Sequence, residues 1–449
     1  MDNLKPRTTA VQTTGMPPGI PYIVGNEAAE RFSFYGMRAI LVVFMVHYLR
    51  DRTGKLAPMS DNDADTWYHV FLASNYFFPI FGAFLSDGFW GKYRTIFWLS
   101  IVYCLGHFAL SLDDTRLGLS LGLTLIAIGS GGIKPCVSAN VGDQFSSANQ
   151  HLISKAFGWF YFSINAGSTV SILLIPWLLE HFGSKVAFAV PGILMAIATI
   201  VFWLGRRKFV HVPPAGRAFF RETFSVEGLA TLGKLAIIYV FVAVFWSLWD
   251  QSGGEWVVQA EKMNLKFMGI TWLPSQIQAV NAVMILAFIP LFQFVVYPAI
   301  SRVYPLTPLR KIGIGLVVAG CSFLVSAWIE TKISAGLTPS IIWQFPAYAL
   351  LTAAEVMVSI TSLEFSYTQA PKSMKSIVMA LYLLSISAGN AFDAFVHEVN
   401  ERPDGTLILS GPNFYLFFAG LAAASAVAFS FFALRHTERT YLQDEAAKA

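Results

Sequence analysis

The chain has 449 residues, of which 55% are apolar and only 13% charged, and its formal net charge is +4. Soluble domains carry about 25% charged residues. The mean hydropathy of +0.56 excludes a soluble enzyme of this length, and it excludes disordered or fibrous chains as well. The composition therefore predicts a helical protein that crosses a membrane many times.

The N-terminal residues 1–22 are polar, contain Pro and Gly, and lack the apolar centre of a signal peptide. We therefore expect the first span itself to direct insertion. Because one span needs about 20 apolar residues, the apolar blocks that follow are long enough to cross. They cover residues 32–49, 67–86, 95–112, 117–139, 157–180, 186–205, 235–258, 277–300, 312–330, 341–363, 376–397 and 412–434.

The sixth and seventh blocks are separated by a basic connection, and six blocks lie on each side of it. We predict an N-terminal half at 1–205, a cytoplasmic linker at 206–234 and a C-terminal half at 235–449. This is the layout of the major facilitator fold, an all-α membrane protein with twelve transmembrane helices in two six-helix halves around a central cavity.

Lys and Arg are concentrated in the connections that lie inside if the N-terminus is inside. The positive-inside bias predicts that both termini are cytoplasmic. The basic linker also fits contact with anionic lipid, but a topology signal alone explains its charge better.

The cysteines Cys104, Cys136 and Cys321 all lie in apolar stretches. Their spacing fits neither a disulfide framework nor a metal-ligand motif. We therefore expect small buried residues and no metal site.

Ionisable residues occur inside the predicted spans or at their edges. An unpaired charge at mid-bilayer costs about 2.5–3.5 kcal/mol, so such groups must pair, take up protons or face a wet cavity. The set is Glu27, Glu30, Arg31, Arg38, Lys134, Asp250, Glu355, Glu364 and Asp393.

The first span carries a stripe of these groups. Glu27, Arg31, Tyr35 and Arg38 follow one another at helical spacings of three or four residues, and Glu30 flanks them. One helix face thus presents acids, bases and a phenol to the protein interior.

Bases and acids in one cavity suit a zwitterion. Arg31, Arg38 or Lys134 can hold a carboxylate, whereas Glu364 or Asp250 can hold an ammonium group. Aromatic residues near these charges in sequence can line side-chain pockets. They are Tyr35, Tyr76, Tyr161, Trp246 and Trp249.

Five sequence blocks, in order, resemble the signature of the proton-dependent oligopeptide transporter family. Residues 27–36 read EAAERFSFYG, close to the E-x-x-E-R-F-x-Y-Y-G motif. Further similar blocks are GIKPC at 132–136 with GDQF at 142–145, FYFSINAGS at 160–168, and SLEFSYTQAP at 362–371 with MKS at 374–376. Residues 82–94 resemble the loop found throughout the major facilitator superfamily.

The resemblance implies a proton-coupled symporter that imports di- and tripeptides by alternating access, with salt-bridge gates and a mid-membrane zwitterion site. It implies substrate-binding roles for Arg31, Tyr35, Arg38, Tyr76, Lys134, Tyr161, Asn165, Phe245, Trp246, Asn281 and Glu364. Proton coupling is implied for Glu27, Glu30, Arg31, Lys134 and Glu364, and gating for an Arg38–Asp250 pair.

The family resemblance also implies which cofactors, partners, oligomeric state and location to expect. We expect no catalytic residue, no metal and no cofactor other than the coupling proton. The expected partners are short peptides and the lipid bilayer, with no nucleic acid, and the expected unit is a monomer in the bacterial cytoplasmic (inner) membrane.

Two departures from the family pattern stand out. The first Tyr of the motif is Phe34 here, so a hydroxyl group is missing. The connection 206–234 is too short for the two additional helices that many bacterial relatives carry between the halves.

Other functions remain as alternatives. A proton-coupled transporter of nitrate or another small solute can use the same fold, but it needs neither Glu364 nor the intact motif at 27–36. A drug or sugar facilitator fits less well. A membrane enzyme would need a nucleophile beside a base, and the histidines are scattered along the sequence.

Overall fold

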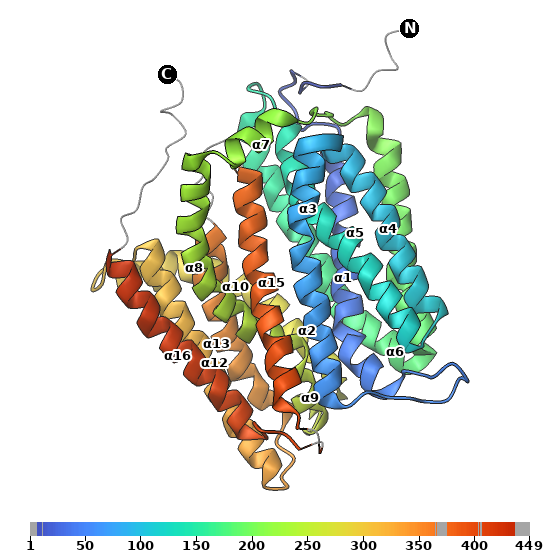
Figure 1. Ribbon diagram of the computed structural model, residues 1–449, viewed down its shortest axis with the longest axis vertical. Helices are drawn as coiled ribbons and strands as arrows, with labels where there is room; N and C mark the ends of the chain where they lie inside the picture. Colours follow the sequence, from blue (N-terminus) through green and yellow to red (C-terminus); the bar gives the residue numbers. More distant parts are fainter. Residues whose placement is uncertain are drawn as a thin grey trace. The chain divides into compact units, whose positions relative to one another are not determined.

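The computed structural model describes residues 7–10, 12–363, 365, 375–402, 404 and 406–435. Helices dominate these residues, and the strands named among them are the short antiparallel pair β1 (Lys266–Phe267) and β2 (Ile270–Thr271) (Figure 1). The prediction of an all-α membrane protein is therefore confirmed.

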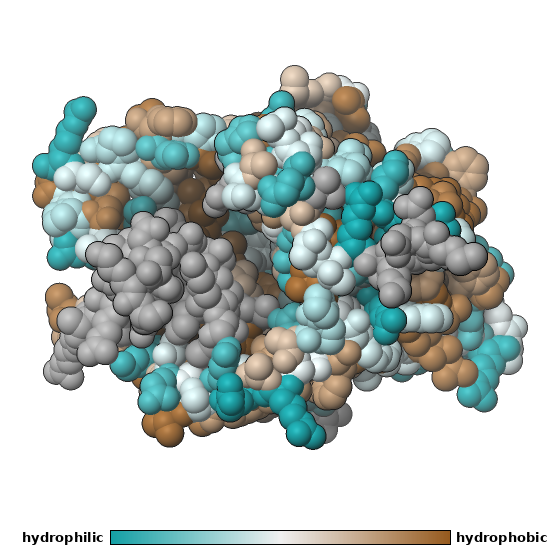
Figure 2. Space-filling view, turned by 90° about the horizontal axis from the view of Figure 1, so that it is seen from above, coloured by the Kyte–Doolittle hydropathy of each residue, from teal (hydrophilic) through white to brown (hydrophobic). Residues whose placement is uncertain are grey.

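Ten helical segments of the described chain are long and apolar enough to cross a membrane. One of them, Lys155–Arg207, contains two helices that meet at Gly183, whose φ of 78° is not helical. The charged helix α1 (Ile20–His47) is also of spanning length. Together these segments account for the twelve predicted spans. Figure 2 shows one end of the molecule, where hydrophilic and hydrophobic residues are interleaved.

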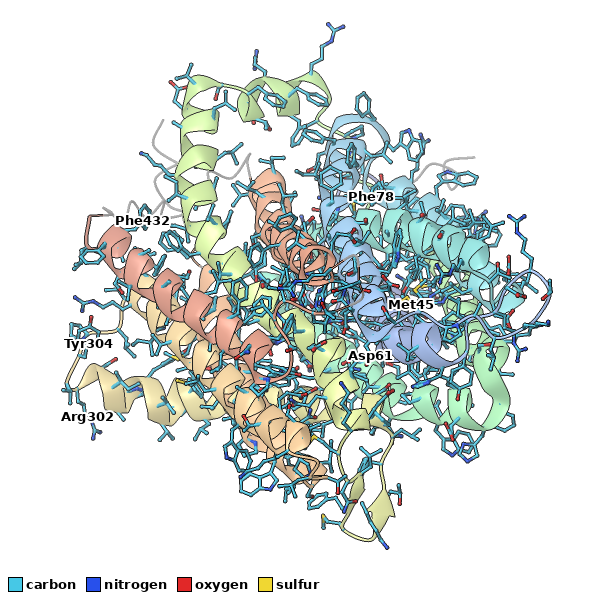
Figure 3. The ribbon with its side chains drawn as sticks, turned by 60° about the horizontal axis from the view of Figure 1, so that its bottom comes forward. Met45, Asp61, Phe78, Arg302, Tyr304 and Phe432 are labelled. Atoms are coloured by element: carbon cyan, nitrogen blue, oxygen red, sulfur yellow. The ribbon has the colours of Figure 1, made fainter. Side chains whose placement is uncertain are left out.

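The chain divides into two compact units. The first comprises 1–59 and 74–225, and the second comprises 60–73 and 226–449. Helix α2 (Asp61–Phe77) therefore contributes to both units, and its first residue, Asp61, is labelled in Figure 3. The predicted linker at 206–234 contains the short helix α7 (Arg217–Thr223) and the first turns of α8 (Val226–Asp250).

In the first unit, α1 packs mainly on α6 (Ile153–Leu204), and α4 (Lys92–Leu112) packs on both α5 (Arg116–Asp143) and α6. Thr115 caps α5, because its hydroxyl oxygen accepts the Leu117 and Gly118 backbone N–H groups at 3.3 and 3.5 Å. The remaining helical segments of this unit are α3 (Pro79–Ala83), η2 (Phe84–Trp90), η3 (Gln150–Leu152) and η4 (Gly205–Arg207).

In the second unit, α12 (Pro308–Ser334) packs on α16 (Pro412–Arg435) and α13 (Gln344–Glu355), as Figure 1 shows, and α15 (Lys375–Asn400) packs on α8. The other helical segments are η5 (Gln251–Gly253), α9 (Glu255–Glu261), η6 (Pro274–Gln278), α10 (Ala279–Leu291), η7 (Phe292–Val296), α11 (Tyr297–Ser301), η8 (Ile341–Trp343) and η9 (Val356–Ile360).

Candidate substrate and proton site

The acids and bases of α1 form a buried ion-pair cluster. Arg31 Nε lies 2.7 Å from Glu27 Oε1 and 3.0 Å from Glu30 Oε2. Both glutamates are 1% exposed. The spacing of four residues puts Glu27 one turn before Arg31, which explains the closer pair. A single guanidinium group thus compensates two carboxylates inside the first unit.

Helix α5 extends this cluster through a hydroxyl group. Lys134 Nζ donates to Ser130 Oγ at 3.1 Å, and Ser130 Oγ donates to Glu30 Oε1 at 3.0 Å. The chain of contacts Lys134–Ser130–Glu30–Arg31–Glu27 joins two cations and two anions of the first unit. Any proton taken up by one member changes the electrostatic energy of all the others.

The lysine also faces aromatic rings. Its ammonium nitrogen lies 4.1 Å from the centroid of Phe34 and 4.9 Å from that of Tyr76. Phe34 is the residue that lacks the hydroxyl group of the family motif. The Phe34 ring makes a cation–π contact with Lys134, and this contact does not require a hydroxyl group.

The remaining predicted residues of the first unit are distributed over α1 and α6. Arg38 and Asn165 are buried, whereas Tyr35 is half-buried. Tyr161 belongs to α6, but its side chain lies outside the part of the structure that is described.

In the second unit, Asn281 meets a carboxylate that received no role in the sequence analysis. Its Nδ2 donates to Glu355 Oε2 at 2.8 Å and to Thr352 Oγ1 at 3.0 Å. Trp249 Nε1 donates to the same carboxylate oxygen at 2.9 Å. Glu364, the predicted partner of an ammonium group, lies outside the described residues.

The predicted aromatic residues adjoin this group along α8. The ring of Trp246 lies 5.2 Å from that of Phe245 and 5.5 Å from that of Trp249, in edge-to-face geometry. A further edge contact joins Trp246 to Tyr382 at 6.5 Å. Edge-to-face packing holds the indole rings in fixed orientations.

A second polar network in this unit was missed by the sequence analysis. Asn390 Nδ2 donates to Asp250 Oδ2 at 2.6 Å, and its Oδ1 lies 2.8 Å from His69 Nδ1. The same imidazole nitrogen lies 3.6 Å from Asp393 Oδ2. His69 looked like one of several scattered histidines, because its partners come from α15, more than 300 residues later in the sequence. Arg38 belongs to the first unit and Asp250 to the second, so their pairing stays a prediction.

Comparison with known proteins identifies the family. A sequence model described as the POT family matches residues 93–232 and 222–411. The chain belongs to the POT family. This confirms the resemblance drawn from the sequence blocks, and membership of a transporter family argues against the membrane-enzyme alternative.

Individual relatives cover most of the chain. Peptide transporter family 1 of Drosophila melanogaster is 37% identical over 71% of this chain and 48% of its own length. The crystal structure of the POT family transporter PepTSo is 36% identical, with a TM-score of 0.83 over 94% of this chain and 98% of that one. The crystal structure of an auto-inhibited POT family peptide transporter is 34% identical, with a TM-score of 0.85 over 95% and 99%.

The lengths of these relatives differ. The chain spans about half the length of the first curated relatives it matches. It covers nearly the whole of the two solved structures. The fold of the POT transporters is therefore represented by the described helices.

Proposed function

We propose that this POT-family protein is a proton-coupled symporter that imports di- and tripeptides by alternating access. The observation that carries the proposal is the array in which Lys134, Ser130, Glu30, Arg31 and Glu27 are linked by contacts of 2.7–3.1 Å. The names of the relatives, which refer to peptide transport, support peptides as the substrate class.

The coupling step follows from charge balance. Glu27 and Glu30 both depend on Arg31, so protonation of one glutamate weakens its hold on the guanidinium group. The released positive charge of Arg31, or of Lys134, then binds the carboxylate of a peptide. Release of the proton restores the original pairs and expels the peptide carboxylate.

The remaining substrate contacts are assigned by chemistry. Arg38 adds to the positive end of the site, and the amides of Asn165 and Asn281 suit the peptide backbone. Aromatic residues, which adapt to different side chains, complete the proposed site. They are Tyr35, Tyr76, Tyr161, Phe245 and Trp246.

The peptide ammonium group needs an anionic partner. Glu364 stays the candidate from the sequence, and in the proposed scheme it also takes part in proton coupling. Glu355 is a second candidate, because its carboxylate already accepts hydrogen bonds from Asn281 and Trp249 and is thereby oriented. An ammonium group would add a further donor to the same carboxylate.

The rest of the proposed cycle concerns the whole protein. Arg38 and Asp250 form the proposed outer gate, and the proton is the coupling ion, with no other cofactor. We propose that the protein works as a monomer in the bacterial inner membrane with both termini in the cytoplasm. Its partners are short peptides and lipid.

Uptake into liposomes tests the proposal. The purified protein is reconstituted, an inward proton gradient is imposed and labelled dialanine is followed. We expect accumulation above the external concentration, abolished by a protonophore, and competition by free-amine dipeptides but not by N-acetylated ones. Accumulation without a gradient would refute the coupling, and equal competition by acetylated peptides would refute the ammonium contact.

A further inference from the structure

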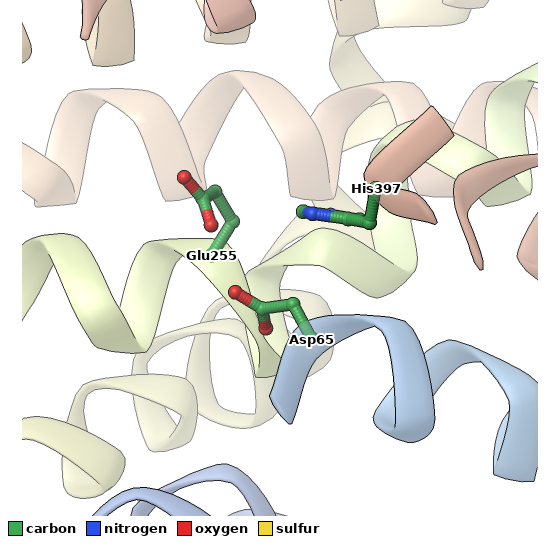
Figure 4. A group of neighbouring side chains, drawn as sticks. All are labelled: Asp65, Glu255 and His397. Carbon is green, nitrogen blue, oxygen red and sulfur yellow. The ribbon is translucent and has the colours of Figure 1, made fainter. Parts of the chain in front are cut away.

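Three potential metal ligands from distant parts of the sequence converge in the second unit. Asp65 on α2, Glu255 on α9 and His397 on α15 each offer one ligand atom, and these atoms lie within 4.8 Å of one another (Figure 4). None of the three has a role in the proposed transport cycle. Any role of this cluster therefore lies outside that cycle.

The carboxyl group of Asp65 lacks the donors that a buried acid needs, and its neighbour is a second carboxyl group, that of Glu255. Asp65 is fully buried, and neither of its oxygens accepts a hydrogen bond from any described donor. Glu255 is half-buried beside it. Two neighbouring carboxylates in such surroundings repel each other unless a cation or a shared proton lies between them.

The histidine is oriented as a ligand. His397 Nδ1 lies 3.1 Å from Asn62 Oδ1, while Asn62 Nδ2 donates to the His397 carbonyl oxygen at 2.9 Å and to Glu401 Oε2 at 3.1 Å. These two donations fix the amide orientation, so Nδ1 must carry the hydrogen. The buried Nε2 atom is left with a lone pair and no partner among the described residues. A hydrogen bond from the other ring nitrogen is typical of metal-bound histidine.

The surrounding charges also favour a cation. Glu330 adds a negative charge and accepts a hydrogen bond from Gln259 at 2.9 Å. Lys262 and Asp61 form a loose pair of 3.9 Å, with both side chains about half exposed. That pair is nearly neutral, so the carboxylates of the cluster remain the dominant local charge.

We propose that Asp65, Glu255 and His397 bind a divalent transition-metal ion such as Zn²⁺. Three protein ligands with nitrogen and oxygen donors suit Zn²⁺, whereas Ca²⁺ and Mg²⁺ require six or more oxygen ligands. Ligands around a tetrahedral Zn²⁺ lie roughly 3.3 Å apart, so small side-chain rotations close the site. The ion ties α2, α9 and α15 together.

Isothermal titration of the tag-free, chelator-treated full chain in detergent with ZnCl₂ tests this site. We expect one Zn²⁺ per chain and no heat with MgCl₂. We expect each substitution of a ligand to weaken Zn²⁺ binding about tenfold or more. These substitutions are Asp65→Asn, Glu255→Gln and His397→Gln. We expect Asn62→Ala, which removes the partner of His397 Nδ1, to weaken Zn²⁺ binding by a smaller factor. The matched controls are Asp63→Asn, an exposed acid on the same helix, and His181→Gln, an exposed histidine.

X-ray absorption at the zinc edge of the wild-type complex gives a second readout that does not depend on folding of the variants. One nitrogen and two carboxylate oxygens from the protein are the expected ligands. The site is refuted if no Zn²⁺ binds, if the three substitutions leave the affinity unchanged, or if the spectrum shows several histidine ligands. Absence of binding would assign the carboxyl pair to a shared proton instead.

Discussion

Glu30 occupies the central position among the titratable residues of the first unit. One of its carboxylate oxygens faces Arg31 and the other accepts the hydroxyl of Ser130. A neutral amide at this position keeps the hydrogen bond from Ser130 but has no negative charge to exchange with a proton. Substitution of Glu30 by glutamine therefore separates the hydrogen-bonding role of this side chain from its role in proton coupling.

We predict that Glu30→Gln retains counterflow exchange of dialanine but loses proton-driven accumulation, with an inside-to-outside ratio of about one. Both activities are measured in the same liposomes. Glu222→Gln, which changes an exposed glutamate of α7, serves as the control and should accumulate like the wild type. Full accumulation by Glu30→Gln would remove this residue from the coupling scheme.

Single substitutions can also identify which residue binds the peptide ammonium group. A hydrogen bond to a charged group contributes about 1.5–3 kcal/mol, so loss of the true partner should weaken dialanine binding about tenfold or more. We predict this loss for at least one of the two candidates, and we compare Glu364→Gln with Glu355→Gln through the inhibition constant of dialanine in counterflow. If Glu364→Gln alone weakens binding, Glu355 only orients Asn281 and Trp249.

At the level of helices, the close approach of α3 and α5 depends on glycine. A Cβ atom added to Gly82 would lie 2.1 Å from the Gly132 carbonyl oxygen. Backbone atoms this close cannot be displaced by a side-chain rotation. The glycines of α5 near Lys134 therefore determine how near the helices come, and α5 continues through Pro135 without a break. A membrane helix can accommodate such a proline within its length.

We predict that Gly82→Ala destabilises the detergent-solubilised protein by about 1–3 kcal/mol, because the added methyl group forces the helices apart. Thermal unfolding followed by intrinsic fluorescence measures the change. Gly25→Ala is the control, since a Cβ at Gly25 meets no atom within 4 Å and alanine favours helix. Equal unfolding temperatures for the two variants would contradict the packing argument.

At the level of the whole molecule, the proposed orientation places two connecting segments on opposite sides of the membrane. Residues 51–56 between α1 and α2 should face outward, and the segment around α7 should face the cytoplasm. Lys55 and Arg217 are both exposed, so a thiol introduced at either position is accessible to reagents from its own side.

We predict that Lys55→Cys reacts with a membrane-impermeant maleimide on intact cells, whereas Arg217→Cys reacts only after permeabilisation. The background carries Ser in place of Cys104, Cys136 and Cys321, and labelling is read on a gel. The reverse pattern would invert the topology and would move the proposed gate to the other side of the membrane.

The sequence alone predicted the number of spans, the family blocks and the stripe on α1, although α1 begins at Ile20 and not at residue 32. Hydropathy and helical spacing are local properties, so Glu27 and Arg31 could be predicted to share one helix face, with Glu30 beside it, before any coordinates were known. The contact of Glu30 with the adjacent Arg31 came from the structure. The need of Lys134 for a polar partner was also predicted, because an isolated ammonium group is unstable in a membrane.

Only the tertiary structure determined which distant residues meet. In the structure, Ser130 links Glu30 to Lys134 through two hydrogen bonds. Asn281 donates a hydrogen bond to Glu355. His69 contacts Asn390 and Asp393. Helix α2 was divided between the two units, a feature with no local signature in the sequence. These contacts depend on how helices pack, and packing depends on side-chain shapes from separate segments, which periodicity along one segment does not encode.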